Sequence, residues 1–187
     1  MAVKRAVFLD KDGTLVDDVP YNIDPQRIRL AQGAGMALRR LLALGFRLFV
    51  VSNQSGIARG LFDEAALGPV RDRIAQLLAD DGVVLDGFYY CPHAPPASGA
   101  PACSCRKPAP GMLLRAAHEH RLTLEHSWMV GDILDDVEAG RRAGCRTVLI
   151  DNGHETEWLP GPQRRPHRRA PDLPQAAAVI AHEAAYP

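Results

Sequence analysis

The sequence predicts an α/β protein built around a central parallel sheet, and three observations lead to that fold class. Five short apolar runs are spread along the chain, segments with helical periodicity lie between them, and the runs are mostly continuous rather than alternating. Continuous apolar runs are typical of strands that helices cover on both faces. Strand–helix alternation further implies parallel pairing through right-handed crossovers.

The runs expected to form strands are rich in Val, Phe, Tyr and Ile, side chains that favour a pleated, buried surface. They cover residues 5–9, 46–52, 87–91, 127–131 and 145–150. Each run is followed by a segment of different periodicity, and no internal repeat relates one run to the next. A single sheet is therefore the simplest arrangement of these strands.

Helices are expected between the strands. The first ends at Gly45, which suits a helix stop. The second opens with an acidic cap at Asp63 and carries a Gly68–Pro69 pair that is expected to bend it. The helical segments cover residues 33–45, 63–82, 110–121 and 133–144, and a closing helix covers residues 173–185.

Two segments interrupt this alternation. Residues 92–110 contain six prolines among small residues and are expected to form a loop. Residues 152–172 are basic and are expected to be irregular. We expect a single domain spanning residues 1–187, in which residues 152–187 form the least distinctive segment.

The bulk composition narrows the classes of function. Lys plus Arg number 22 and Asp plus Glu also number 22, so no net charge points toward nucleic acid. No stretch approaches the ~18 apolar residues that a transmembrane helix needs, and the N-terminal apolar run is too short for a signal peptide. We expect a cytoplasmic protein in a reducing compartment, a monomer that binds neither nucleic acid nor membrane.

Polar side chains follow the ends of the expected strands. Because ligands gather at the carboxyl ends of parallel strands, residues from several strands should meet at one edge of the sheet. The residues placed there are Asp10, Asp12, Ser52, Cys91, His93, Asp132 and Asp151. This convergence predicts a functional site at that edge.

The pair Asp10 and Asp12 suggests phosphoryl chemistry. A carboxylate can attack phosphorus to form an aspartyl-phosphate. The carboxylate and the phosphate monoester are both negatively charged, and two like charges ~4 Å apart repel by about 4 kcal/mol at an effective dielectric constant of ~20. Lys107 could neutralise phosphate oxygens, and a Mg²⁺ ion could bridge the phosphate and the carboxylates. One carboxylate would then attack, while its neighbour, pushed toward protonation, would serve the leaving group as a general acid.

Each of these signals has a plainer interpretation when it stands alone. The residues DKDG at 10–13 also suit a surface turn, because Asp–Gly pairs favour turns. Asp132 and Asp136 also suit the start of a helix, where the dipole favours negative charge. Ser52 after a strand is a common turn residue, although hydroxyl and N–H groups there can hold phosphate oxygens. The acidic pair after the first strand favours metal binding for Asp132.

Taken together and in order, these pieces resemble the haloacid dehalogenase superfamily of phosphohydrolases. The matching pieces are DKDGT at 10–14, Ser52 after an apolar strand, Lys107 before a helix, and GDILDD at 131–136. The resemblance implies a Rossmann-like three-layer sandwich and a Mg²⁺ cofactor. Residues 15–45 and 53–86 each hold one helix, which leaves no room for a large cap domain.

The same resemblance implies a role for each matching residue. Asp10 is the expected nucleophile, Asp12 the general acid/base, and Ser52 and Lys107 hold the phosphoryl group. Asp10, the backbone carbonyl of Asp12, and Asp132 are the expected protein ligands of Mg²⁺. Asp136 is expected to support this site from behind the ligands.

A narrower resemblance covers nearly the whole chain. The segments SNQSGIARG, YYCPH and CSCRKPAPGM are similar to those of phosphatases that remove the 7-phosphate of heptose 1,7-bisphosphate in lipopolysaccharide precursor synthesis. Histidinol-phosphate phosphatases share the cysteine-rich loop and are the alternative, but SGIARG favours the heptose enzymes. By this resemblance Asn53, Arg59 and Arg106 contact a small phosphorylated sugar.

Four potential metal ligands lie close together in the loop of about residues 91–106. They are Cys91, His93, Cys103 and Cys105. Three thiolates and one imidazole could complete a structural Zn²⁺ site, whereas unpaired structural cysteines are the alternative that suits Cys145. The loop has few large apolar side chains, so metal binding would supply the free energy that burial cannot. Because Cys105 precedes Lys107 by two residues, zinc is expected to fix the positions of Arg106 and Lys107.

The remaining histidines and arginines are expected to play no part in the site. The histidines at 118, 120, 126, 154, 167 and 182 are scattered, and we interpret them as surface or packing residues. The arginines of residues 164–169 are interpreted as a solvated segment, because the neutral charge balance and the lack of an aromatic platform argue against nucleic acid.

A receiver-type signalling module is the alternative from another functional class. It also combines acids, a hydroxyl and a lysine on a parallel sheet, but its acceptor Asp ends a middle strand. Here the first strand carries both the acceptor, Asp10, and an acid two residues on, which favours turnover over a lasting phosphoryl state. A phosphotransferase is a third alternative, distinguished by its dependence on an acceptor.

Overall fold

The computed structural model describes residues 3–96 and 103–185. In that part of the chain the strands form one six-stranded sheet in which every pair is parallel. The strands are β1 (Ala6–Leu9), β2 (Arg47–Asn53), β3 (Gly87–Cys91), β4 (Trp128–Gly131), β5 (Arg146–Ile150) and β6 (Arg168–Ala170). Their order is β3-β2-β1-β4-β5-β6, so β1 lies between β2 and β4. The predicted fold class is confirmed.

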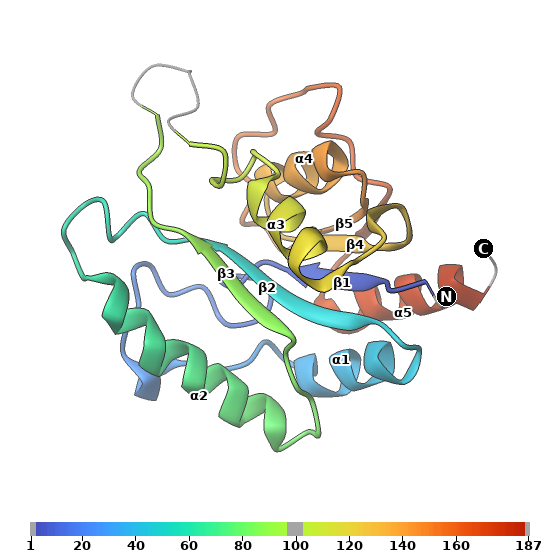
Figure 1. Cartoon of the computed structure of the whole chain (residues 1–187), viewed down its shortest axis with the longest axis horizontal. Coiled ribbons are helices and arrows are strands. Elements are labelled where there is room, and N and C mark those ends of the chain that lie inside the picture. The colour runs from blue at the N-terminus through green and yellow to red at the C-terminus, as the bar shows by residue number, and fades with distance from the viewer. Residues whose placement is uncertain (1–2, 97–102, 186–187) are drawn as a thin grey trace.

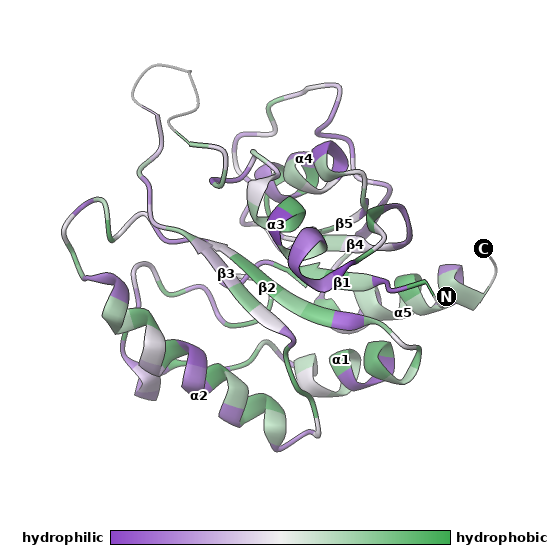
Figure 2. Ribbon diagram, viewed as in Figure 1, coloured by the Kyte–Doolittle hydropathy of each residue, from purple (hydrophilic) through white to green (hydrophobic). Residues whose placement is uncertain are grey.

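Helices cover both faces of the sheet and make three layers (Figure 1). One face is covered by α1 (Ala34–Ala43), α2 (Leu67–Ala79) and α5 (Leu173–Ala185), and the other by α3 (Gly111–His120) and α4 (Leu134–Ala143). Successive residues of β1 serve the two layers: Val7 and Leu9 pack on the first side and Phe8 on the second. Both faces of a strand are therefore apolar, which explains the continuous runs. Figure 2 shows a similar run, with hydrophobic residues along most of the length of β2.

One expected helix differs in the structure. The predicted bend at Gly68–Pro69 is wrong, because α2 begins at Leu67, after a 3-10 turn at Glu64–Ala66. Pro69 therefore lies in the first helical turn, where a backbone N–H has no partner inside the helix to lose. Asp63 instead caps the 3-10 turn, because its carboxylate accepts a hydrogen bond from the N–H of Ala66 at 3.1 Å.

The C-terminal segment contains a strand where the sequence predicts irregular structure. β6 extends the sheet beyond β5, with Val148 opposite Arg168 and Ile150 opposite Ala170. Of its three residues only Ala170 is buried, because an edge strand can leave its other side chains in solvent. A strand without an apolar run escapes prediction from hydrophobic pattern, and the adjacent strand β5 supplies the pairing that forms it.

The connections between strands contain no cap domain among the described residues, as predicted. The connection from β1 to β2 holds a 3-10 turn at Pro25–Arg27 and α1, and the next connection holds the turn at Glu64–Ala66 and α2. Residues 97–102, the middle of the predicted zinc loop, lie outside the described residues. Within the described ranges, no helix has the length and apolar character needed to cross a membrane.

Candidate active site

The candidate site lies at the carboxyl edge of the sheet. Asp10 follows β1, Ser52 lies near the end of β2, and Asp132 follows β4. From β1 the chain continues outward to β2 and β3 on one side of the sheet. It then returns to β4 on the other side of β1 and continues to β5 and β6, so the direction of the strand order reverses between β1 and β4. Ligands of open α/β sheets bind at such a switch point. Asp151, predicted at the same edge, pairs with Arg169 at 3.5 Å.

Three carboxylates form a compact buried cluster at the switch point. Asp10, Asp132 and Asp136 each offer one oxygen, and these oxygens all lie within 4.8 Å of one another. Oxygen ligands so closely grouped suit a hard divalent cation such as Mg²⁺. The sequence predicts Asp10 and Asp132 as ligands with Asp136 behind them, and the structure brings all three side chains together.

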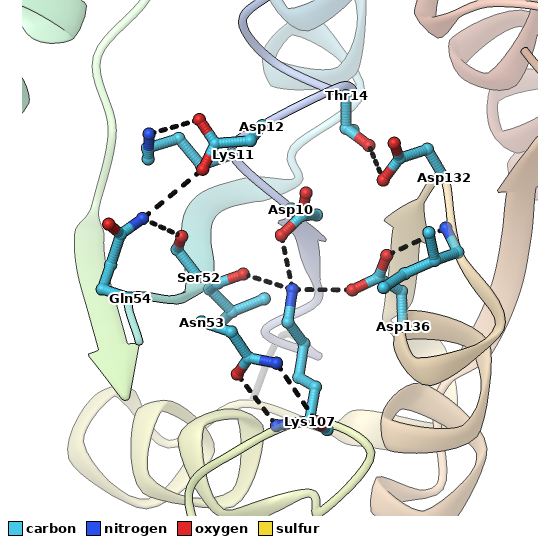
Figure 3. A network of polar contacts seen from close by, with 12 residues as sticks. Asp10, Lys11, Asp12, Thr14, Ser52, Asn53, Gln54, Lys107, Asp132 and Asp136 are labelled. Atoms are coloured by element: carbon cyan, nitrogen blue, oxygen red, sulfur yellow. Dashed lines mark hydrogen bonds and ion pairs between the residues drawn. The ribbon is translucent and has the colours of Figure 1, made fainter. Parts of the chain in front are cut away.

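Lys107 supplies the positive charge of the cluster. Its Nζ lies 2.5 Å from Asp10 Oδ1 and 2.6 Å from Asp136 Oδ1, and it donates to the carbonyl of Val51 at 2.9 Å (Figure 3). Burial by itself would lower the pKa of Lys107, but the Asp10 and Asp136 carboxylates outweigh it and hold the pKa above its usual value. One ammonium therefore faces three carboxylates, which leaves the cluster short of positive charge.

The pKa values of two of the three acids are raised, chiefly by burial. Burial, followed by repulsion from Asp10, raises the pKa of Asp132 to about 7. Burial also raises the pKa of Asp136, although its contact with Lys107 opposes the rise. A divalent cation would stabilise the ionised form of both carboxyl groups and reverse this shift.

Asp136 reaches the cluster because of two features of the chain. Its Oδ2 accepts the N–H of Ile133 at 3.3 Å, so the carboxylate caps the start of α4. At Gly131 a Cβ would collide with the side chain of Asp136, so only glycine leaves room for this approach. The two interpretations of GDILDD are thus compatible, since Asp136 caps a helix and lines the site.

Asp12 lies beside the cluster with partners of its own. Its Oδ1 is 2.5 Å from the Nζ of Lys11, and its Oδ2 accepts a long hydrogen bond of 3.4 Å from Gln54. Burial raises the pKa of Asp12, Lys11 opposes the rise and Asp10 adds to it. The sequence predicts that the charge of Asp10 causes the shift, whereas burial is the larger cause. The side chain is 32% exposed, so solvent weakens these effects.

The end of β2 supports Lys107 and contributes polar groups. Ser52 Oγ accepts a hydrogen bond of 2.7 Å from the side-chain amide of Gln54 (Figure 3). The amide of Asn53 donates to the carbonyl of Lys107 at 3.1 Å and accepts from its N–H at 3.0 Å. In this structure Asn53 thus holds the backbone of Lys107, and its contact with substrate stays a prediction.

Two further residues, Gln54 and His154, lie at the site although no role was predicted for them. Gln54 links Ser52 to Asp12, and its signal in the sequence is its place in the segment SNQSGIARG, directly after Ser52 and Asn53. His154 was expected at the surface or in packing, but its Nδ1 lies 2.6 Å from Asp132 Oδ2. Nothing in the sequence indicates that contact, because the two residues are far apart in the chain and belong to connections after different strands.

The four predicted zinc ligands come together at the end of β3. In each of Cys91, His93, Cys103 and Cys105 one ligand atom lies within 4.8 Å of the others, so this cluster could hold a metal ion. The pKa of Cys103 falls to about 7 because hydrogen bonds, led by the N–H of Arg106, outweigh burial. This shift favours the thiolate at Cys103, whereas burial raises the pKa of Cys91 and of Cys105. A bound cation would have to stabilise those two thiolates. Cys145 is buried apart from the cluster, as expected.

The two predicted substrate arginines lie on loops, Arg106 directly before Lys107 and Arg59 between β2 and α2. Arg106 donates to the carbonyl of His93 at 3.1 Å, which ties it to the cysteine-rich loop. The guanidinium of Arg59 lies over the ring of Tyr21, 5.9 Å from its centre. The loop is also fixed to α3, since the N–H of Gly111 donates to the carbonyl of Ser104 at 2.9 Å.

Comparisons with known proteins identify the family. The profile of the HAD-hydrolase-like family matches residues 104–176. The D-glycero-beta-D-manno-heptose-1,7-bisphosphate 7-phosphatase of Pasteurella multocida is 44% identical over 154 residues, which cover 81% of this chain and 84% of the relative. The chain belongs to the haloacid dehalogenase-like hydrolase family.

Other members share both sequence and fold with this chain. The enzyme of the same name from Escherichia coli K12 is 44% identical over 152 residues, covering 79% of this chain and 80% of the relative. The crystal structure of D,D-heptose 1,7-bisphosphate phosphatase from B. bronchiseptica, complexed with magnesium and phosphate, matches with a TM-score of 0.78. That match has 32% identity and covers 96% of this chain and 99% of the other.

The strand order of this HAD-like hydrolase also decides against the receiver alternative. Receivers have the sheet order 2-1-3-4-5, whereas here β1 lies between β2 and β4. In the observed order the nucleophile candidate Asp10 ends a central strand that is also the first in sequence. The signalling-module interpretation is therefore wrong.

Proposed function

We propose that the protein is a Mg²⁺-dependent phosphatase that removes the 7-phosphate of D-glycero-D-manno-heptose 1,7-bisphosphate in the synthesis of lipopolysaccharide heptose precursors. The names of relatives at 44% identity support this substrate, and they specify its beta anomer. The observation that carries the proposed chemistry is the buried contact of Lys107 with Asp10, beside a cluster of carboxylates.

Asp10 is the nucleophile of the proposed reaction. A carboxylate oxygen attacks the phosphorus, a P–O bond to Asp10 forms, and the P–O bond to the sugar breaks. Lys107 holds the attacking carboxylate and offsets negative charge as the phosphoryl group arrives. Asp10, Asp132 and the backbone carbonyl of Asp12 would hold Mg²⁺, which would supply further positive charge to the phosphoryl group.

Asp12 moves the protons of the proposed reaction. The direction of its pKa shift, upward, suits a proton carrier. In the proposed reaction the protonated carboxyl group of Asp12 donates its proton to the departing alkoxide. The resulting carboxylate then takes a proton from the water that attacks the aspartyl-phosphate. Inorganic phosphate leaves, Asp10 is restored as a free carboxylate, and Asp12 again carries its proton.

The surrounding loops bind the substrate in this proposal. Ser52 and Lys107 hold phosphoryl oxygens, while Asn53 orients Lys107 through its backbone in addition to any contact with the sugar. Arg59 and Arg106 bind the second phosphate of a bisphosphate, as anion-binding side chains on flanking loops. The absence of a cap among the described residues suits a site that small sugar phosphates reach directly.

A structural Zn²⁺ ion in the Cys91, His93, Cys103 and Cys105 cluster completes the proposal. The ion fixes the end of the loop that carries Arg106 and Lys107. We place the protein in the cytoplasm, because reduced thiols persist in that compartment.

A kinetic comparison of two substrates tests the proposed function. We expect kcat/KM for the heptose bisphosphate to exceed that for histidinol phosphate by about a hundredfold or more, since a site built for two anions leaves charged groups unpaired with a monophosphate. Release of inorganic phosphate is the measurement. Equal or better turnover of histidinol phosphate would make the protein a histidinol-phosphate phosphatase instead.

The substitution Asp10→Asn tests the covalent step. It should lower kcat by about a thousandfold or more, because an amide cannot attack phosphorus. Asp17→Asn, the same change at an exposed neighbouring acid, should leave kcat unaltered. Full activity of Asp10→Asn would exclude covalent catalysis by this residue.

A further inference from the structure

The segment that follows β5 crosses to the loop after β1 and is fastened there. The side chain of Asn152 donates to the carbonyl of Gly13 at 2.9 Å and accepts the N–H of His154 at 3.3 Å. The same amide thus fixes both the neighbouring loop and the backbone of His154. The imidazole of His154 then lies with Nδ1 2.6 Å from Asp132 Oδ2.

The three carboxylates of the cluster are held in different ways. Asp10 and Asp136 each contact the ammonium of Lys107. Asp132 is held instead by His154 and, more loosely, by the hydroxyl of Thr14 at 3.4 Å from its Oδ1. The orientation of Asp132 therefore depends chiefly on the shorter contact, the one from His154.

The position of His154 is fixed by more than its own contact with Asp132. Glu155, the next residue, accepts the N–H of Leu134 at 2.6 Å, which joins this segment to the start of α4. Farther along, Arg164 contacts Asp135 at 2.9 Å, again on α4. The contact of Arg164 corrects the interpretation of that residue as merely solvated, whereas Arg165, Arg168 and Arg169 are exposed as predicted.

Gly13 lies where the loop after β1 meets the side chains of Asp132 and His154. A Cβ at this position would collide with both Asp132 and His154. The loop after β1, the carboxylate and the imidazole are therefore in direct contact, and the side chain of His154 is 37% exposed, so only part of the ring is covered. An imidazole in this position can hold the carboxylate of Asp132, a proposed metal ligand, without closing the site.

We propose that His154 is a positioning residue for magnesium, because it donates Nδ1–H to Oδ2 of Asp132 and holds that carboxylate in the orientation that leaves its other oxygen for the ion. This inference rests on the proposed magnesium site. Hydrogen bonds to a ligating carboxylate typically change metal affinity by about 10–100-fold. His154 itself touches neither substrate nor phosphorus in this scheme.

Calorimetric titration of the zinc-loaded full chain with Mg²⁺, in the absence of substrate, tests the proposal. We expect His154→Ala to weaken Mg²⁺ binding by about tenfold or more. His154→Asn should bind within about threefold of the wild type, because its amide nitrogen stands at the same distance along the side chain as Nδ1. His118→Ala, at an exposed histidine of α3, should leave the affinity unchanged.

Activity provides a second measurement. For His154→Ala the Mg²⁺ concentration that gives half-maximal rate should rise in step with the dissociation constant, while kcat at saturating Mg²⁺ stays within about threefold of the wild type. A fall in kcat without a change in Mg²⁺ affinity would overturn the proposal. So would Mg²⁺ binding by His154→Ala that is unchanged or tighter, the latter showing that His154 competes with the ion for Asp132.

Two further variants keep the test decisive. If His154→Ala does not fold, His154→Asn and His154→Gln replace it, and equal Mg²⁺ affinity of these two would overturn the positional argument. Asp132→Asn should abolish Mg²⁺ binding. If it does not, the proposed magnesium site itself fails and this inference with it. Loss of binding in Asp132→Asn together with wild-type affinity in His154→Ala and His154→Gln would overturn the inference alone.

Discussion

At the scale of single residues, the ammonium group of Lys107 balances two buried carboxylates. Its side chain is 2% exposed, and those of Asp10 and Asp136 are 12% and 0% exposed. Charges so removed from water are tolerated only while they remain paired. Asn53 adds to this arrangement by fixing the backbone of Lys107, so the position of one cation depends on the end of β2.

This pairing predicts a rescue between two substitutions. Lys107→Met should lower the free energy of unfolding by about 3–5 kcal/mol, because it leaves two carboxylates buried without a cation. Adding Asp136→Asn should recover part of that loss by removing one uncompensated charge. Urea denaturation in magnesium-free buffer is the measurement. A double variant no more stable than Lys107→Met would contradict the prediction, and Arg71→Met, in an exposed pair, should change stability by less than about 1 kcal/mol.

At the scale of elements, the edge strand β6 is attached to β5 by a histidine as well as by backbone pairing. Nδ1 of His167 accepts the N–H of Thr147 at 3.0 Å, and Arg141 lies 3.2 Å from its other nitrogen. Burial, followed by the positive charges of Arg141, Arg146 and Arg168, lowers the pKa of His167. The neutral ring is thus the form that the folded protein favours.

The lowered pKa of His167 predicts a pH dependence of stability. In the unfolded chain the group titrates near ~6.5, so its contribution is complete above that pH and is lost as the pH falls toward the lower folded-state value. Between pH 7.5 and 5.5 the wild type should therefore lose more stability than His167→Asn, which has no proton to gain. The difference should stay below about 1.4 kcal/mol per pH unit, since solvent reaches the ring. Parallel melting curves of the two proteins would contradict this assignment.

The cysteine-rich loop is the element most dependent on a metal. Cys105→Ser should lower the zinc content of the purified protein and weaken phosphate affinity, because the end of the loop carries Arg106 and Lys107. Zinc analysis and competitive inhibition by inorganic phosphate are the measurements. Cys145→Ala, outside the cluster, should leave both values at wild-type levels. Unchanged phosphate affinity in demonstrably zinc-free protein would refute the link between zinc and Lys107.

At the scale of the whole molecule, one sheet separates two apolar layers, and neither layer can unfold independently of the other. Adjacent residues of β1 belong to different layers, with Val7 packed on one face and Phe8 on the other. Loss of either layer would expose the central strands that support the other. The proposed active site lies where both halves of this sheet meet, so its geometry depends on the complete fold.

This architecture predicts a single cooperative unfolding transition for residues 1–187. Scanning calorimetry should give a calorimetric enthalpy equal to the van't Hoff enthalpy, because both layers share the same sheet. The protein should also elute as a 20.4 kDa monomer, the mass of one chain. Two resolved transitions would contradict the single-domain prediction, and a larger mass would contradict the monomer.

Most of the fold and the acidic part of the site could be predicted, for identifiable reasons. The central strands are buried on both faces and therefore carry continuous apolar runs, and Asp10 and Asp132 follow two of those runs directly. β6 could not be predicted in the same way, because its exposed residues carry no apolar pattern. His154 is exposed, as predicted, but its contact with Asp132 could not be predicted, because a lone histidine in a loop has no periodicity that would indicate its partner.

The sequence by itself determined the parallel α/β class, the acids at the strand ends, Lys107 and the cysteine cluster, because each depends on local pattern or on short motifs. Only the tertiary structure decided that one ammonium serves both Asp10 and Asp136, that Asn53 holds Lys107, and that His154 contacts Asp132. The physical reason is that each of these contacts joins residues that lie at the ends of different strands or in the segments after them. Their distances follow from sheet order and packing, which no local stretch of sequence contains.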